Sequence, residues 1–192
     1  MRAEPLVIID GRFARAGIRE PMSRANGINW YAVYTRPRSE KKLAEGLQKL
    51  GIEHYLPLLR TRKKWSDRYK WVEEPVFASY LFVHIEFERD SLRVLKLPQA
   101  VYFVSTEGAP TVIEAGDLEL LRLAVDHYAE SLVIRDTSVL TAGETVRIKD
   151  GPFAGKEAVI ERIQGKTLVV VAFPALNKSV QVELPVEQLT RI

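Results

Sequence analysis

The chain has 192 residues, of which 46% are hydrophobic and 28% are charged, and it contains no cysteine. This composition is typical of a globular protein with one medium domain or two small ones, and it excludes disulfide and thiolate–metal chemistry. The apolar runs are too short to span a bilayer or to act as a secretion signal, so we expect a cytoplasmic location. The net charge of +3 is uneven, because residues 30–75 hold 11 basic and 6 acidic residues. This excess favours a polyanionic partner, although a solvated charged surface has the same composition.

Residues 1–29 contain five arginines and show no sustained hydrophobic period. Such a segment is typical of a mobile N-terminal extension, in which Leu6–Ile9 is apolar enough to dock. We therefore expect the first ordered strand to begin at Trp30.

Residues 30–130 show the strand patterns of a first domain. Trp30–Tyr34 is aromatic and β-branched, which favours a strand. A strongly basic hairpin is expected next, with Asp67 in its turn and with Trp65 and Trp71 among its cations. The expected strands lie at 30–34, 54–60, 69–74, 80–85 and 101–104.

Three helices are expected between these strands. Leu43, Leu47 and Leu50 mark one face of a helix that begins near Pro37 and ends at Gly51. Asp90 or Ser91 caps a short helix that carries Leu92 and Leu95, and a third helix begins near Asp117. The alternation of these strands and helices predicts an α+β sandwich, one sheet with helices packed on a face.

Residues 131–142 are turn-rich and lack a helical stripe, so we expect a linker there. Residues 143–192 offer five short β runs, at 145–149, 158–164, 166–172, 178–184 and 188–192. Five strands in about fifty residues predict a small, closed or nearly closed β-barrel, because an open sheet of that size exposes its edges and has no core.

Between the first two runs lies a glycine-framed loop with the order Gly-Pro-Phe-Ala-Gly-Lys. Gly151 follows a strand, Phe153 is expected to be structural, and Gly155 stands where a second turn requires a positive φ. This strand–loop–strand pattern resembles the KOW motif, except that Ala158 replaces the glycine usual at the start of the second strand. The loop is not a phosphate loop, because the spacing is one residue short and Glu157 replaces the magnesium-binding Ser or Thr.

The first strand, the basic helix start, the run 77–83 and the KOW segment together resemble the NusG family of two-domain bacterial transcription elongation factors. The resemblance covers residues 30–192 and implies an NGN-like first domain at 30–130 and an SH3-like KOW barrel at 143–192. The N-terminal extension, the run 62–68 and the strand 80–83 are closer to the specialised, operon-restricted branch of UpxY type, with RfaH-like proteins more distant.

The resemblance implies a non-catalytic factor that binds the clamp helices of RNA polymerase and suppresses pausing or termination. Transferred by position, the polymerase-binding rings are Tyr34, Phe77, Tyr80 and Phe82. Aromatic rings of this kind dominate interface energies. The alternative is that they fill the core, since both faces of the strand 80–85 are apolar and at most one of them is a docking surface.

The basic start of the first helix is where the family approaches the non-template DNA strand. The residues at these positions are Arg36, Arg38, Lys41 and Lys42, and their side chains suit phosphates and unpaired bases. For the barrel, the resemblance implies docking of a ribosomal protein or a termination factor, with Phe173, in the loop after the third barrel strand, as the contact residue. The valine-rich strands favour a stable barrel over a helical alternative.

Catalysis and cofactor binding are not indicated. The three histidines are far apart without cysteine neighbours, so no metal site is expected. No nucleophile elbow occurs, and the acidic pairs have no basic or nucleophilic partner in the sequence. We expect a monomer without a cofactor, catalytic residues or a membrane contact. A ribosome-associated KOW protein and a scaffold with a non-specific nucleic-acid-binding hairpin remain the alternative functions.

Overall fold

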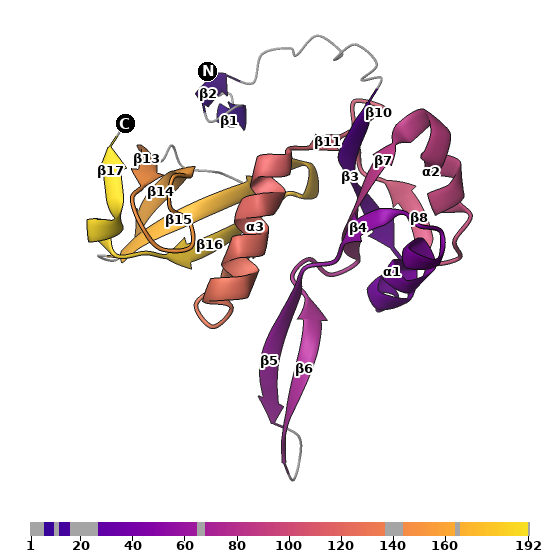
Figure 1. Ribbon diagram of the computed structural model, residues 1–192, viewed down its shortest axis with the longest axis horizontal. Coiled ribbons are helices and arrows are strands. Elements are labelled where there is room, and N and C mark those ends of the chain that lie inside the picture. Colours follow the sequence, from indigo (N-terminus) through magenta and orange to yellow (C-terminus); the bar gives the residue numbers. More distant parts are fainter. Residues whose placement is uncertain are drawn as a thin grey trace, which may run out of the picture. The chain divides into compact units, whose positions relative to one another are not determined.

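The computed structural model describes residues 6–9, 12–15, 27–64, 68–136, 144–163 and 166–191. The chain divides into two compact units (Figure 1). One, the sheet unit, comprises Ala25–Val125, and the other, the barrel unit, comprises Met1–Arg24 with Asp126–Ile192.

The sheet unit is built on a five-stranded antiparallel sheet. Its strands follow the spatial order β11-β3-β7-β4, with β8 also paired to β3. The long central pair β3 and β7 begins with the pairing of Ile28 and Glu86 and ends with that of Tyr34 and Tyr80. The strand bounds are β3 (Ile28–Thr35), β4 (Glu53–Tyr55), β7 (Tyr80–Glu86), β8 (Ala100–Phe103) and β11 (Val112–Ile113).

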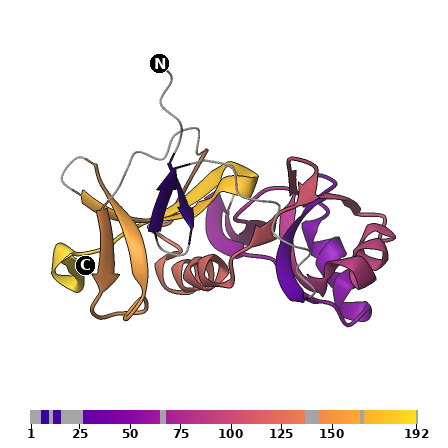
Figure 2. The ribbon, with the colours of Figure 1, turned by 90° about the horizontal axis from the view of Figure 1, so that it is seen from above.

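Helices α1 (Glu40–Lys49) and α2 (Phe87–Leu95) lie on the same side of this sheet, as Figures 1 and 2 show. The core between them contains alternate residues of β3 and β7 together with Leu43 and Leu47 of α1 and Val94 of α2. The period-2 pattern of a strand thus puts Tyr31, Val33 and their cross-strand partners against the helices. The other face of the same strands carries Tyr34, Tyr80 and Phe82.

Helix α1 begins later than the sequence indicates. Arg38 has a φ of 58°, which no α-helix accommodates, so the helix starts at Glu40 after the N-cap residue Ser39 and not near Pro37. Its expected end is confirmed, because Gly51 takes the positive φ of a helix-terminating residue.

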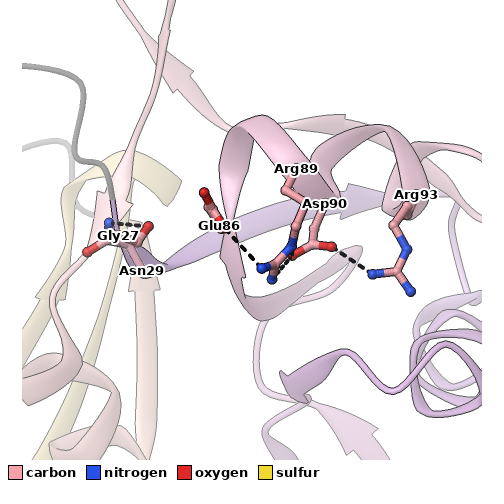
Figure 3. Close-up of polar contacts among 6 residues, drawn as sticks. All are labelled: Gly27, Asn29, Glu86, Arg89, Asp90 and Arg93. Carbon is pink, nitrogen blue, oxygen red and sulfur yellow. Dashed lines mark hydrogen bonds and ion pairs between the residues drawn. The ribbon is translucent and has the colours of Figure 1, made fainter.

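Helix α2 differs from the prediction in both its start and its buried face. It begins at Phe87, directly after β7, so Asp90 lies inside the helix and does not cap it. Leu92 is 68% exposed, whereas the Asp90 carboxylate is buried. Its oxygens accept hydrogen bonds from Arg89 and Arg93, each with a shortest distance of 2.7 Å (Figure 3). These bonds hold the pKa of Asp90 below its usual value, and the two cations explain why an acid occupies the inner face.

A short hairpin of β9 (Ser105–Thr106) and β10 (Ala109–Pro110) leads to β11 and to helix α3 (Ala115–Tyr128). The sequence predicts an apolar stripe of Leu118, Leu121, Val125 and Tyr128 on α3, and it is partly confirmed, because Leu118 and Leu121 are buried. The last three residues of the helix fall within the barrel unit. No helix in the described part of the chain is both long and apolar enough to cross a membrane.

Strands β5 (Leu58–Lys64) and β6 (Tyr69–Pro75) form the predicted basic hairpin. They make a two-stranded sheet of their own and extend beyond the sheet and helices of the same unit (Figure 1). The turn residues 65–67, and with them Trp65 and Asp67, lie outside the described residues.

The main sheet of the barrel unit contains, in its described residues, the five predicted strands and one more. This sheet has the order β12-β16-β15-β14-β13-β17, and every pair is antiparallel. Val169 pairs with Val182 and Val171 with Val180, and all four are buried, which explains the preference for strand. The bounds are β12 (Val133–Asp136), β13 (Glu144–Ile148), β14 (Glu157–Ile163), β15 (Lys166–Phe173), β16 (Lys178–Glu183) and β17 (Leu189–Arg191), with short 3-10 turns at Pro174–Leu176 and Val186–Gln188.

Two sequence expectations fail at the edges of this unit. The predicted linker is wrong for β12, whose residues pair with β16 and extend the sheet. The predicted mobile extension contains an antiparallel hairpin of β1 (Leu6–Ile9) and β2 (Arg12–Arg15). In both segments, backbone pairing with a neighbouring strand supplies order that composition alone does not reveal.

The KOW loop has the predicted glycine conformations. Gly151 and Gly155 have φ values of 78° and 79°, a region that a side chain disfavours. The Gly155 N–H donates to the Ile148 carbonyl at 2.8 Å, which closes the loop onto β13. Phe153 is 1% exposed and its ring stacks on Tyr128 with centroids 5.2 Å apart, so its predicted structural role is confirmed.

Candidate functional site

Three tyrosines form a row across three neighbouring strands of the sheet unit. Tyr34 of β3 pairs directly with Tyr80 of β7 on one side and with Tyr102 of β8 on the other. The Tyr34 and Tyr102 rings stack at 4.8 Å, and the Tyr34 and Tyr80 rings meet edge-on at 5.2 Å. Directly paired residues share a sheet face, so this tyrosine row lies opposite the helices α1 and α2. Tyr102 is 48% exposed, and Tyr34 and Tyr80 are half-buried.

The two predicted phenylalanines lie beside this row but are not exposed. Phe82 pairs with Ala32 of β3, and the Phe77 ring contacts the Phe82 ring edge-on at 6.1 Å. Phe77 is 1% exposed and Phe82 is fully buried. The expectation of an exposed aromatic surface is therefore wrong for Phe77 and Phe82 and holds only in part for Tyr34 and Tyr80, which are half-buried. The core interpretation therefore applies to the two phenylalanines of this cluster, and the surface interpretation applies to its tyrosines.

The aromatic cluster continues towards helix α3. Tyr55 of β4 pairs with Phe82 in register, and their rings lie roughly parallel with centroids 6.4 Å apart. The Arg122 guanidinium of α3 lies over the Tyr55 ring at 4.8 Å from its centroid. A cation over an aromatic face is attracted by the quadrupole of the ring. This contact places α3 on the aromatic face of the sheet, opposite to α1 and α2.

The loop that carries Phe77 is fixed by two hydrogen bonds to Ser79. The Ser79 N–H donates to the buried Glu40 carboxylate at 2.7 Å, and the Ser79 carbonyl accepts from the Thr35 N–H at 2.8 Å. Ser79 has a φ of 64°, which is unfavourable for a residue with a side chain. A carboxylate at the start of α1 also interacts favourably with the helix dipole. Glu40 thus joins the basic helix start to the aromatic cluster.

The four predicted nucleic-acid-binding residues gather at this helix start. Arg36, Arg38, Lys41 and Lys42 are all exposed. The Arg36 N–H donates to the Gln99 carbonyl at 3.0 Å, which fixes the backbone before the helix. Lys41 forms an ion pair with Glu73 of the hairpin at 3.2 Å. A cationic surface therefore lies next to the tyrosine row in the same unit.

The barrel residue chosen from the sequence is not accessible. Phe173 is the last residue of β15 and does not lie in a loop, and it is 1% exposed. Its position at the end of a valine-rich strand explains the error, because the strand continues one residue beyond the predicted end. A docking role that needs an exposed Phe173 ring is not supported.

Sequence reasoning missed Tyr102, Tyr55 and Arg122, which complete the aromatic cluster. Tyr102 lies in a predicted strand, where alternation places it on the opposite face to the buried Phe103. That alternation is a signal that could have identified it. Tyr55 and Arg122 had no such signal, because their contact joins β4 to α3 across 67 residues of sequence.

The fold and this site define a class of two-domain binding proteins. An α+β domain displays a tyrosine row beside a basic helix start, and a small β-rich domain with a KOW loop follows. Comparison with family models agrees with this order. Residues 28–122 match the model described as transcription termination factor nusG, and residues 142–172 match the KOW motif. The two matches together support the NusG family for this chain, with its N-terminal domain followed by its KOW motif.

Curated relatives extend this similarity over most of the chain. The "Transcription termination/antitermination protein NusG" of Bacillus subtilis is 29% identical over 181 residues, which covers 85% of this chain and 98% of that protein. The protein of the same name from Campylobacter jejuni is 25% identical and covers 85% and 97%, respectively. Among solved structures, "Domain interaction in Thermotoga maritima NusG" is 21% identical, with a TM-score of 0.45 over 86% of this chain and 97% of that one.

Proposed function

We propose that this chain is a non-catalytic transcription factor that acts in termination or antitermination and binds RNA polymerase through the aromatic face of its sheet unit. The names of the similar proteins support the general assignment. The tyrosine row is the single observation that carries the contact with polymerase. Three adjacent, mutually packed rings present a rigid surface, and tyrosine gives a large contact area at a low cost in conformational entropy.

The polymerase surface proposed here differs from the one expected from sequence. In this proposal Tyr34, Tyr80 and Tyr102 contact the partner, whereas the buried Phe77 and Phe82 support them from within the cluster. We place the clamp helices against this row. A helix pair that buries its apolar side chains against the row gains hydrophobic energy in proportion to the area removed from water.

The basic helix start provides a second contact, with the non-template DNA strand. Arg36, Arg38, Lys41 and Lys42 are exposed and lie next to the aromatic cluster, to which Glu40 connects their helix. A factor that binds the clamp helices through its tyrosine row therefore holds the four cations at the start of α1 at a fixed distance from the non-template strand. Each phosphate neutralised on a single strand contributes about −0.7 to the slope of log affinity against log salt.

An operon-specific antitermination role belongs to the same proposal. The N-terminal segment precedes the residues that match the family model, and the basic hairpin carries exposed cations. We assign both to the recognition of a specific nucleic-acid signal. The barrel unit would then dock a ribosomal protein or a termination factor through exposed residues other than Phe173.

The decisive experiment measures binding of the purified full-length chain to purified core RNA polymerase free of nucleic acid. The double substitution Tyr34→Ala with Tyr102→Ala removes two of the three rings, and each anchor ring of an interface is typically worth about 2 kcal/mol. We expect a loss of affinity of 100-fold or more. Tyr102 is 48% exposed but Tyr34 is half-buried, so thermal unfolding of the variant checks that the fold is retained.

The matched control is Tyr69→Ala, which removes an exposed tyrosine from the hairpin. It should leave affinity for core polymerase unchanged. Equal affinity of the double variant and the unmodified chain would exclude the tyrosine row as the contact. Binding to bulk RNA in preference to polymerase would instead favour the ribosome-associated alternative.

A further inference from the structure

One face of the β5–β6 hairpin carries cations and aromatic rings in alternation. In register, Arg62 lies opposite Trp71, and Lys64 lies opposite Tyr69. Arg60 shares this face, because residues two apart on a strand point the same way. We call this set of five side chains the hairpin ladder: Arg60, Trp71, Arg62, Tyr69 and Lys64.

The rings of the hairpin ladder are paired with guanidinium groups and are still exposed. The Arg60 guanidinium lies 5.0 Å from the Trp71 ring centroid, and that of Arg62 lies 4.3 Å from the Tyr69 ring centroid. Trp71 is 53% exposed and Tyr69 is 57% exposed. A guanidinium group therefore lies over each ring, and about half of each aromatic residue is still exposed to solvent. Arg60, Arg62 and Lys64 are exposed as well.

The opposite face of the hairpin has a different composition. There Lys63 forms an ion pair with Glu74, which also accepts a hydrogen bond from Thr61. On the ladder face, the acidic residue Glu73 pairs with Lys41 of α1 at 3.2 Å. The three cations of the ladder thus form a positive stripe interleaved with aromatic rings, on a hairpin that is separate from the five-stranded sheet.

We propose that the hairpin ladder binds an unpaired nucleic-acid strand. Bases stack on Trp71 and Tyr69, and the side chains of Arg60, Arg62 and Lys64 bind the flanking phosphates. Aromatic rings beside cations are the recurrent means of binding single strands, because every base has a π-face. This site shares no residue with the basic start of α1, although Lys41 reaches its edge at Glu73, and it does not depend on polymerase binding.

The spacing of the rings favours an unpaired strand over a duplex. Tyr69 and Trp71 are two residues apart on one strand, which separates them by about 6.8 Å. Bases in a duplex are stacked about 3.4 Å apart, so they offer no free faces to rings at twice that spacing. An unpaired strand can extend and place one base on each ring. An acidic peptide would satisfy the cations but leaves the rings without a planar partner.

Fluorescence of Trp71 tests the proposal directly. The chain has three tryptophans, so Trp30→Phe with Trp65→Phe leaves Trp71 as the sole tryptophan. The probes are single-stranded DNA and RNA of about 12 nucleotides and one sequence, the corresponding DNA duplex, and heparin as a polyanion without bases. We expect both single strands to quench Trp71 fluorescence on binding, and we expect heparin to bind without quenching. Tighter binding of RNA or of DNA would identify the natural strand and would support the proposal in either case.

Affinity measurements with variants separate stacking from charge. Trp71→Leu keeps an apolar side chain but removes the stacking surface, and we expect single-strand affinity to fall about 10-fold or more. Arg62→Lys keeps the charge but loses the planar group, and a smaller loss of a few-fold is expected. The matched control is Lys70→Gln, which removes a cation from the other face and should reduce affinity less than twofold.

Two results would overturn the proposal. One is a duplex that binds as tightly as the single strands, which would make the ladder a patch of unspecific charge. The other is unchanged Trp71 fluorescence at saturating single strand, because binding would then occur elsewhere, for example at the basic start of α1. Thermal unfolding of each variant checks that the fold is retained. The fluorescence measurement needs no substitution in the hairpin ladder, because only Trp30 and Trp65 are replaced.

Discussion

The sheet unit contains two aromatic clusters that are packed in opposite ways. On the sheet, rings pack against rings, from Tyr102 through Tyr34 to Tyr80, with Phe82 fully buried beside them. On the hairpin, each ring packs against a guanidinium group and stays more than half exposed. Ring–ring packing makes a rigid apolar surface that suits a protein partner. Ring–cation packing makes a surface that is at once planar and positive, which suits a nucleic-acid strand.

The largest expected contrast lies in stability. Phe82→Ala should destabilise the sheet unit by about 3–5 kcal/mol, because it removes a fully buried ring and leaves a cavity. Trp71→Ala should cost less than about 1 kcal/mol, because it removes an exposed ring and one cation–π contact. Urea unfolding followed by far-UV circular dichroism measures both. Similar losses in the two variants would contradict the division into a packed cluster and an exposed one.

This contrast also bears on how polymerase binding is tested. A Phe82→Ala variant that fails to bind would be ambiguous, because loss of folding and loss of contact give the same result. Tyr34 and Tyr102 are the better positions, since Tyr102 is 48% exposed and Tyr34 is half-buried, whereas Phe82 is fully buried. Polymerase binding is therefore better tested by substitutions in the tyrosine row than by substitution of the buried Phe82.

The second prediction concerns the loop that holds the sheet cluster. Glu40→Ala should cost about 1–3 kcal/mol, because it leaves the Ser79 N–H without its carboxylate acceptor. Glu40→Gln retains an acceptor oxygen and should cost less. The control is Glu45→Ala, an exposed acidic residue of the same helix, which should change the free energy of unfolding by no more than about 0.5 kcal/mol. Faster hydrogen exchange at Ser79 in Glu40→Ala alone would locate the effect in this loop.

The sequence predicted most strands of both units because alternation and β-branched runs are local signals. Glu40 illustrates what local signals leave out, since its partner Ser79 is 39 residues away. Asp90 illustrates a second limit: an acid is expected at the surface or at a helix cap, and only two neighbouring arginines allow it to be buried. These two limits explain the errors in the buried face of α2 and in the membership of the aromatic cluster.

The hairpin was predicted, but its ladder was not. A sequence shows that cations and aromatic residues are interleaved, yet the residues that face one another depend on the register. The observed register places Arg62 opposite Trp71 and Lys64 opposite Tyr69. A shift by one residue would bring Lys63 opposite Trp71 and put Arg60, Arg62 and Lys64 on the opposite face from the two rings.

A third prediction uses the helix that lies on the aromatic face of the sheet. Burial, together with the nearby Glu114 carboxylate, raises the pKa of Asp117 to about 6. In the unfolded chain this carboxyl loses its proton near pH 4, so between about pH 4 and pH 6 the folded protein binds more protons. Stability therefore falls as the pH rises through this window, and the cost is complete above about pH 6.

The substitution Asp117→Asn removes this cost. The shift of about two pKa units corresponds to at most about 3 kcal/mol, and partial exposure reduces the expected gain to about 1–2 kcal/mol at pH 7. At pH 4 or below the variant should gain little from this source. Asp126→Asn, an exposed position on the same helix, is the control and should show no such pH dependence. A gain at pH 7 that persists unchanged at pH 3.5 would show that the charge of Asp117 is not its origin.

The smallest predicted effect concerns the ion pair between the two regions. Lys41 of α1 and Glu73 of β6 are 3.2 Å apart, with half or more of each side chain exposed. A double-mutant cycle with Lys41→Gln and Glu73→Gln should give a coupling energy below about 1 kcal/mol, and high salt should reduce it further. Glu73→Gln has a second consequence, because it releases Lys41 and removes the acidic residue beside Arg60. Single-strand affinity should then rise about two- to threefold at low salt, whereas affinity for core polymerase should not change. A rise in both affinities would mean that the hairpin and the tyrosine row act as one surface, and the distinction between protein and nucleic-acid contacts would no longer hold.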